Sequence, residues 1–307
     1  MKKAAIAAAV ICFMVPPLFV VAGVGVWVAQ GMDGYTAPGR AHAVTSDIPI
    51  EMGGLYERAA ERFGIPWPML AAVGRVECRH GLDPRCSRPN EAGAEGPMQF
   101  LPATFARWSW ASGSPAPSPY DAEDAVYAAA AKLAADGVNG DPTKALLSYN
   151  RSRAYVADVM AWALWYGWSP PDSSLLRESV LKHPRIGLRP GAAADVEAGR
   201  VDPRVLTVLL FAATEHRLSH VGPFVSGHSY FVAGTGRPSN HAFGRAVDIP
   251  VVDGKPVSPE NRAAMRVIER ARYAEPDEIG SPWPKPVDGA HTFTEGHDDH
   301  LHFGWRP

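Results

Sequence analysis

Apolar residues recur at helical spacing along the first half of the chain. From Glu51 onward they return every three to four positions, and stretches rich in glycine, proline and serine separate one helical run from the next. After the helix that begins at Glu51, the predicted helices cover residues 69–77, 104–108, 121–135, 143–149 and 155–165. This pattern predicts a nearly all-helical domain over residues 49–168.

The pattern changes after residue 200. Two segments, 201–216 and 261–273, have the spacing of amphipathic helices. Short segments with the alternation and residue types of strands occur at 223–226, 246–249 and 301–303. Residues 201–307 are therefore expected to form an α+β domain, so the fold class is multi-domain. The polar stretch 169–200, which contains several prolines, is expected to be a linker together with the entry to this second domain.

The N-terminus combines positive charge with a long apolar run. Lys2 and Lys3 precede an uncharged stretch from Ala4 to Ala29, which is the order found in export signals. This run is long enough to cross a bilayer, which takes about 20 residues. Residues 1–30 are therefore expected to be a retained membrane anchor or a cleaved signal peptide, and residues 31–48 a linker. Both alternatives place the rest of the chain outside the cytoplasm, either membrane-anchored or secreted.

Composition narrows the choice of partners. The chain has 307 residues, enough for about two domains, and 46% of them are hydrophobic, so neither half needs to be disordered. The formal net charge is −2, and no part of the sequence has a basic stripe. These features argue against a nucleic-acid partner.

The cysteines agree with an exported protein. Cys12 lies in the apolar run, which leaves Cys78 and Cys86 as a pair in the exported region. A disulfide across this short loop is expected in an oxidising compartment, and two free thiols are the alternative. Neither cysteine is expected to bind zinc, because the sequence has no CxxC motif or second pair nearby.

Glu77 ends an otherwise apolar helix. Burial disfavours the charged form of a carboxyl group, so a position beside the apolar face should raise its pKa. A raised pKa suits a general acid that protonates a glycosidic oxygen near neutral pH. From this stretch alone, the alternative is an ordinary surface glutamate at a helix end.

Further motifs follow Glu77 in the chain. The segment Gly96-Pro97-Met98-Gln99-Phe100 is expected to be a loop that presents an amide side chain and backbone donors, and Tyr149-Asn150 ends a helix. In this order, and with Tyr155-Val156 after them, the motifs resemble the soluble lytic transglycosylase family, whose fold is that of goose-type lysozyme. The resemblance implies that Glu77 acts as acid and then as base on peptidoglycan. It also implies that the sugar cleft is lined by Met98, Gln99, Tyr149 and Asn150.

The sequence departs from this family directly after the glutamate. The family usually has a serine there, and this chain has Cys78. A two-carboxylate hydrolase would need a second acid about 5–9 Å away, and no residue of the sequence is an obvious candidate. That suits a transglycosylase, in which the muramyl C6 hydroxyl attacks internally and one glutamate serves both steps. A hydrolytic muramidase is the alternative.

A second group of polar residues lies towards the C-terminus. His241 opens a turn, and Asp248 and His302 each stand between apolar neighbours on predicted strands. Two imidazoles and one carboxylate, with a fourth position left for water, are a ligand set of catalytic zinc sites. A lone histidine is more often a core residue, but the four histidines between His291 and His302 weaken that alternative.

Three motifs in this half resemble the zinc D-alanyl-D-alanine peptidase superfamily, which includes other murein endopeptidases. They are Ser226-Gly227-His228, Ser239-Asn240-His241 with Asp248, and His300-Leu301-His302. The resemblance covers residues 201–307 and implies a zinc ion bound by His241, Asp248 and His302. It also implies roles for three residues nearby: Asp299 as the acid that activates the zinc-bound water, and His297 or His300 as the group that stabilises the oxyanion.

One expected residue of this superfamily is missing. Many relatives hold the substrate carboxylate with an arginine at the position of Ser229. Arg237 or Arg245 is the candidate substitute. Without such a clamp, an endopeptidase or an inactive binding module is favoured over a carboxypeptidase.

Three functions are consistent with this sequence. The first is a bifunctional cell-wall hydrolase that cleaves both the MurNAc–GlcNAc β-1,4 bond and a murein peptide bond. The second is an active transglycosylase whose zinc module only binds peptide stems. The third is a component of an envelope-spanning secretion or conjugation apparatus, held at the membrane by the N-terminal helix.

Overall fold

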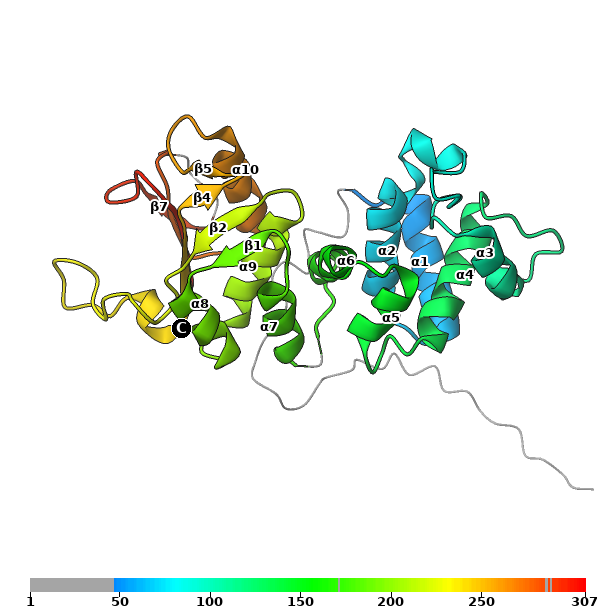
Figure 1. Ribbon diagram of the computed structural model, residues 1–307, viewed down its shortest axis with the longest axis horizontal. Coiled ribbons are helices and arrows are strands. Elements are labelled where there is room, and N and C mark those ends of the chain that lie inside the picture. Colours follow the sequence, from blue (N-terminus) through cyan, green and yellow to red (C-terminus); the bar gives the residue numbers. More distant parts are fainter. Residues whose placement is uncertain (1–46, 171, 285–286, 288) are drawn as a thin grey trace, which may run out of the picture. The chain divides into compact units, whose positions relative to one another are not determined.

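The computed structural model describes residues 47–170, 172–284, 287 and 289–307 (Figure 1). The expected signal or anchor segment, residues 1–30, and nearly all of the 31–48 linker lie outside these residues. Within the described ranges, no helix combines the length and the apolar character needed to cross a membrane.

Helices make up the N-terminal part of the structure. The α-helices are α1 (Ile50–Phe63), α2 (Trp67–Cys78), α3 (Pro102–Trp108), α4 (Ala122–Ala135), α5 (Pro142–Tyr149) and α6 (Arg153–Trp165). The short 3₁₀ helices η1 (Arg79–Gly81) and η2 (Pro84–Ser87) follow α2, and η3 (Ser109–Ala111) follows α3. In the described residues before 169, the β pairing consists of one bridge between Glu95 and Phe100. The expected all-helical region is confirmed.

Local sequence determines where several of these helices begin and end. Asp121, Asp141 and Ser152 each accept a hydrogen bond from a backbone N–H in the first turn of α4, α5 and α6, respectively. Pro68 lies in the first turn of α2, where a missing N–H costs nothing. Helix α1 ends at Gly64, whose φ of 64° closes the helix in the left-handed conformation.

A buried network fixes the end of α2. Gly74 lets α1 approach closely, because a Cβ at this position would lie 2.1 Å from the Tyr56 hydroxyl oxygen. The Tyr56 hydroxyl is 3.1 Å from Nδ1 of His80, and Nε2 of His80 is 2.9 Å from the Tyr166 hydroxyl. Burial lowers the pKa of His80 to about 4, so the ring is neutral at pH 7. The chain just after Glu77 is thereby tied to α1 and to the end of α6.

The C-terminal part combines helices with two four-stranded sheets, as expected for an α+β region (Figure 1). One sheet has the order β1-β2-β4-β5 and the other β3-β8-β6-β7. The strands are β1 (Ile186–Leu188), β2 (Leu218–Val221), β3 (Ala246–Ile249), β4 (Val251–Val252), β5 (Lys255–Pro256), β6 (Glu278–Gly280), β7 (His291–Phe293) and β8 (Leu301–Gly304). The helices are α7 (Ser174–Leu181), α8 (Pro190–Glu197), α9 (Pro203–Ala213) and α10 (Arg262–Ala271).

Most of segment 169–200, expected to be a linker and the entry to the second domain, is regular structure. It forms α7, β1 and α8, and β1 pairs in parallel with β2. Leu176, Val180 and Val196 are buried in the core. The sequence did not indicate these elements, because the apolar positions occur in runs too short to show helical periodicity.

The strand expected at 223–226 is also wrong: these described residues form bends and the start of a turn. Pro223 has no N–H to donate to a ladder. The N–H groups of Val225 and Ser226 donate to the Asp195 carboxylate over 2.9 and 2.7 Å. A side chain therefore takes the hydrogen bonds that a neighbouring strand would need.

Candidate functional site

Glu77 lies in the last turn of α2 and is half-buried. Burial raises its pKa to about 7, and the nearby hydroxyl of Tyr155 partly offsets the rise. A carboxyl group with this pKa is protonated in a large fraction of molecules at neutral pH. Glu77 can therefore donate a proton and later accept one.

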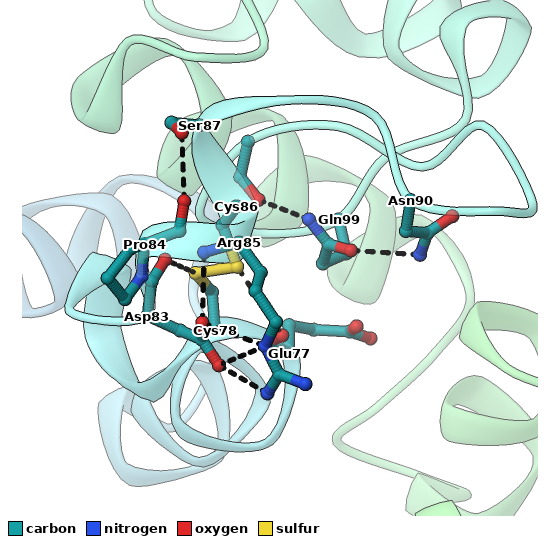
Figure 2. Close-up of a disulfide and its surroundings, with 10 residues drawn as sticks. Glu77, Cys78, Asp83, Pro84, Arg85, Cys86, Ser87, Asn90 and Gln99 are labelled. Carbon is teal, nitrogen blue, oxygen red and sulfur yellow. Dashed lines mark hydrogen bonds and ion pairs between the residues drawn. A yellow bond between two sulfur atoms is a disulfide. The ribbon is translucent and has the colours of Figure 1, made fainter.

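The expected disulfide between Cys78 and Cys86 is present. It joins the end of α2 to η2, and Asp83 and Arg85 form an ion pair in the loop that it closes (Figure 2). Figure 2 shows the Glu77 side chain pointing away from the two sulfur atoms. The disulfide thus fastens the backbone beside Glu77 and leaves the carboxyl group accessible to other partners.

The Gly96–Phe100 loop is held by its own backbone. Glu95 and Phe100 exchange two hydrogen bonds of 2.9 Å. Gly96 has φ 72°, and a Cβ there would lie 1.7 Å from the carbonyl oxygen of Pro119, so only glycine fits. The Gln99 side chain donates to the Gly96 carbonyl over 2.8 Å and accepts from Asn90 over 3.0 Å (Figure 2). The loop presents Gln99 in a fixed orientation.

Met98, within this loop, contacts Tyr149. The Met98 side chain is fully buried, and its carbonyl accepts a 2.9 Å hydrogen bond from the Tyr149 hydroxyl. The Tyr149 ring stacks on that of Tyr155 with centroids 6.3 Å apart. Burial, and then the nearby charge of Glu77, raise the pKa of both phenols well above the usual value. Both tyrosines are therefore neutral neighbours of the acid.

Asn150 and Tyr155 complete the surroundings in different ways. Asn150 is exposed at the end of α5, and its side-chain oxygen accepts from the Ser152 N–H over 3.2 Å. The Tyr155 hydroxyl is buried beside the Glu77 carboxyl group, whose pKa it lowers. In the sequence, Tyr155 was only part of a family motif and had no assigned role. The signal that could have identified it is a tyrosine in the first turn of an apolar helix.

The second group of candidate residues combines one face of the β3-β8-β6-β7 sheet with His241, which lies in the short 3₁₀ helix η4 (Asn240–Phe243). Asp248 on β3 pairs with His302 on the central strand β8, and His302 pairs with Gly280 on β6. Directly paired residues project to the same face of a sheet, so strand register brings Asp248 and His302 together. Gly280 leaves room beside them for the ring of His297, since a Cβ there would lie 2.3 Å from that ring.

Three predicted metal ligands converge on this face. Nδ1 of His302 lies 2.9 Å from Oδ1 of Asp248, and Nε2 of His241 lies 3.3 Å from that nitrogen and 3.4 Å from that oxygen. Nδ1 of His241 is 2.9 Å from the Phe224 carbonyl oxygen, which directs Nε2 towards the other two. Burial would raise the pKa of Asp248, but hydrogen bonds with His241 and His302 outweigh it and hold the pKa well below the usual range.

These three donor atoms fit a zinc ion. Zn–N and Zn–O bonds of about 2.0–2.2 Å in a tetrahedral site place neighbouring ligand atoms about 3.3 Å apart. The separations of 2.9, 3.3 and 3.4 Å lie close to that spacing. Two imidazole nitrogens and a carboxylate oxygen are also donors that zinc accepts.

The remaining candidates lie at the rim of this group. Nε2 of His300 is 3.8 Å from Oδ1 of Asp248, and its Nδ1 is 2.7 Å from Oδ1 of Asp299. The Asp299 side chain is 88% exposed, so it reaches the group through His300. The His297 ring lies 4.6 Å from that of His300, and Nδ1 of His297 is 2.7 Å from the Glu295 carbonyl oxygen.

Arg237 is paired within the protein. Its guanidinium lies 3.3 Å from a carboxylate oxygen of Glu278, while the other oxygen accepts from Asn240 over 2.7 Å. Glu278 is buried on β6, and sequence reasoning missed it. Its place beside Ile279 in a short apolar strand was the same signal that pointed to Asp248.

Asp195 is a second residue that sequence reasoning missed. It is fully buried on α8 and binds the backbone of Val225 and Ser226, the Ser226 hydroxyl and the Arg200 guanidinium. These contacts hold the loop whose Phe224 carbonyl orients His241.

His228 lies next to one of the three predicted metal ligands, His241. Its ring stacks on that of His241 with centroids 4.0 Å apart and an interplanar angle of 14°. One ligand atom from each of His228, His241 and Asp248 lies within 4.8 Å of the other two.

Comparison with protein families identifies a match in the helical part. Residues 54–162 match the family described as Transglycosylase SLT domain. The matched segment runs from α1 into α6 and contains Glu77, Gln99 and Tyr149. This match indicates peptidoglycan as the substrate, cleavage by a lytic transglycosylase, and action outside the cytoplasm, where that polymer lies. Comparisons with curated proteins and with solved structures found no match.

Proposed function

We propose that this chain cleaves the MurNAc–GlcNAc β-1,4 bond of peptidoglycan with Glu77 as its acid and base. The proposal rests on the position of Glu77 in the segment that matches the transglycosylase family, together with burial that raises its pKa to about 7. Gln99, fixed in its loop, and Tyr149, a neutral neighbour of Glu77, are the proposed contacts for the sugar.

The reaction needs one carboxyl group in two protonation states. Protonated Glu77 gives its proton to the glycosidic oxygen as the bond to muramyl C1 breaks. The resulting carboxylate takes the proton of the muramyl C6 hydroxyl, whose oxygen bonds to C1. The product is a 1,6-anhydromuramyl end, and Glu77 is again protonated. In the described residues, burial and Tyr155 are the influences that set the pKa of Glu77, and no second carboxylate contributes.

Mass spectrometry of purified peptidoglycan digested by the full chain tests this proposal. Glu77→Gln should reduce anhydromuramyl products by about 10²–10⁴-fold, because general acid–base catalysis is lost. The matched control is Glu57→Gln, at an exposed position of α1, which should cleave normally. Ordinary reducing ends that depend on Glu77 would make the enzyme a muramidase. Full activity of Glu77→Gln would contradict the proposal.

We also propose that the C-terminal part hydrolyses a murein peptide bond at a zinc site formed by His241, Asp248 and His302. The donor spacing described above supports this. When bound, the zinc ion would lower the pKa of a water molecule and polarise the scissile carbonyl. His300 lies next to Asp248 and is backed by Asp299, so this pair can carry a proton between the site and solvent. His297 lies beside them with Nδ1 facing the Glu295 carbonyl oxygen, so it can donate from Nε2 to a developing oxyanion only when its ring is protonated.

A peptide-binding module without catalysis is the competing function for this part. It is favoured by the ion pair that engages Arg237 with Glu278, since a substrate carboxylate would have to compete for that guanidinium. The same digests decide between the two: peptide-cleaved products that disappear in His241→Ala support the peptidase. Zinc binding without such products supports the binding module. For the chain as a whole, attachment to the membrane through residues 1–30 and service in an envelope-spanning apparatus are further parts of the proposal.

A further inference from the structure

We propose that His228 is a fourth protein ligand of the metal held by His241, Asp248 and His302, and that it closes the site in the resting protein. This inference rests on the proposed zinc site. It assigns a role to a residue that would otherwise be one exposed histidine in a surface turn.

The hydrogen bonding of His228 prepares it to bind a metal. Nδ1 lies 2.8 Å from the carbonyl oxygen of Ser229. A carbonyl oxygen only accepts, so Nδ1 carries the proton and Nε2 keeps a free lone pair. Metal-binding histidines are commonly oriented in this way, by a bond from the nitrogen that does not face the ion.

The ring is already beside the other donors. It stacks nearly parallel on His241, with centroids 4.0 Å apart. Its ligand atom lies within 4.8 Å of those of His241 and Asp248, compared with the roughly 3.3 Å between ligand atoms in a tetrahedral zinc site. The His228 side chain must therefore rotate towards His241 and Asp248 to bind the same ion.

Both ends of the turn that carries His228 are anchored. On one side, the Ser226 N–H and hydroxyl bond to the buried Asp195 carboxylate over 2.7 Å. On the other, the Ser239 N–H donates to the Tyr230 carbonyl over 2.8 Å. Gly227, with φ 88°, allows the chain to turn between these points. The backbone therefore keeps His228 close to the ligand group, and only its exposed side chain needs to move.

The consequence is a site with two states. Three imidazoles and one carboxylate fill all four positions of a tetrahedral zinc ion, as in structural zinc sites, and leave none for water. His228 is exposed on its outer side, so it is the ligand that an incoming peptide can displace. The peptidase activity is then latent until substrate moves His228 aside.

Metal affinity of the full chain tests this inference without relying on catalysis. Competition with a chelator should show zinc bound at least about tenfold more weakly by His228→Ala than by the natural protein, since even outer partners of metal ligands contribute about 10–100-fold. The control is His220→Asn, which changes an exposed histidine on β2 and keeps a residue that tolerates its φ of 57°. This variant should bind zinc normally.

Cobalt substitution gives a second readout. The visible absorption of Co²⁺ in the natural protein should change little on addition of azide, because no coordination position is open. In His228→Ala, azide should change the spectrum. Equal zinc affinity and equal azide response in both proteins would overturn the role of His228 while leaving the three-ligand site intact. Failure of the natural protein to bind zinc would overturn the proposed site as well.

Discussion

The helical part and the β3-β8-β6-β7 sheet prepare their chemistry in different ways. In the helical part a single carboxyl group, Glu77, becomes reactive because burial shifts its pKa, and its neighbours are neutral phenols. On the sheet, no one residue is sufficient. His241, Asp248 and His302 come from three segments: strand pairing places Asp248 beside His302, and the Phe224 carbonyl orients His241 towards both. One site therefore depends on environment, and the other on register.

Asp248→Asn should separate the two sites most clearly. The amide removes the anionic ligand while keeping its size, so zinc affinity should fall by about 100-fold or more. Glycan cleavage at Glu77 should not change. Chelator competition and glycan digestion on the same preparation check both results. A parallel loss of glycan cleavage would show that the two sites are coupled.

Glu77→Gln should make the protein more stable at high pH. The pKa of Glu77 is raised from 4.5 to about 7 in the folded state, so the natural protein has its full stability below about pH 4.5 and loses part of it as pH rises through about 7. Glutamine does not titrate, and the variant avoids this loss. Because the group is partly open to solvent, the expected gain at pH 8 is about 1–3 kcal/mol in the free energy of unfolding.

Urea unfolding followed by tryptophan fluorescence at pH 4.5 and pH 8 measures this difference. Glu57→Gln, at the exposed position on α1, should show no such dependence on pH. A Glu77→Gln difference that is the same at both pH values would mean that burial does not raise the pKa of Glu77.

Asp195→Asn should weaken the metal site from a distance. The amide cannot accept all the hydrogen bonds that the carboxylate receives from the loop, so the Phe224 carbonyl should hold His241 less firmly. Zinc affinity should fall about tenfold. Glu197→Gln, on an exposed position of the same helix, is the control. If Asp195→Asn binds zinc as tightly as the natural protein, the loop does not position His241.

Tyr155→Phe should have the smallest effect. The Tyr155 hydroxyl lowers the pKa of Glu77, and removing it should raise that pKa by less than burial already does. The general acid must be protonated, so the loss of glycan cleavage at high pH should move to a higher pH. A pH–rate profile compared with that of Tyr230→Phe, a change in the C-terminal part, measures this shift. A shift to lower pH would contradict the role given to Tyr155.

The same contrast explains what the sequence could predict. Helical periodicity and the order of the Glu77, Gln99 and Tyr149 motifs are local features, and they predicted the helical part and its candidate site. His241, Asp248 and His302 were recognised as a ligand set by residue type and alternation, and the structure brings them together. The family comparison supports the helical part, whereas the zinc site remains a prediction.

Residues whose partners are distant in sequence were missed. Asp195 has no signature on α8, because its role appears only when residues 225 and 226 fold against it. Asp195 also binds the N–H groups that a strand at 223–226 would need for pairing. Glu278 is recognisable only by its partners Asn240 and Arg237, which are about 40 residues away in the sequence and contact it only in the folded sheet.

Gly280 and His297 constrain each other sterically. The ring of His297 occupies the space that a side chain at 280 would take, and a Cβ there would lie within 2.7 Å of three of its atoms. A homologue that carries alanine at 280 must therefore displace or replace the histidine at 297. In an alignment of relatives, these two positions should vary together, and a change at 280 alone should mark a chain that has lost the rim of this site.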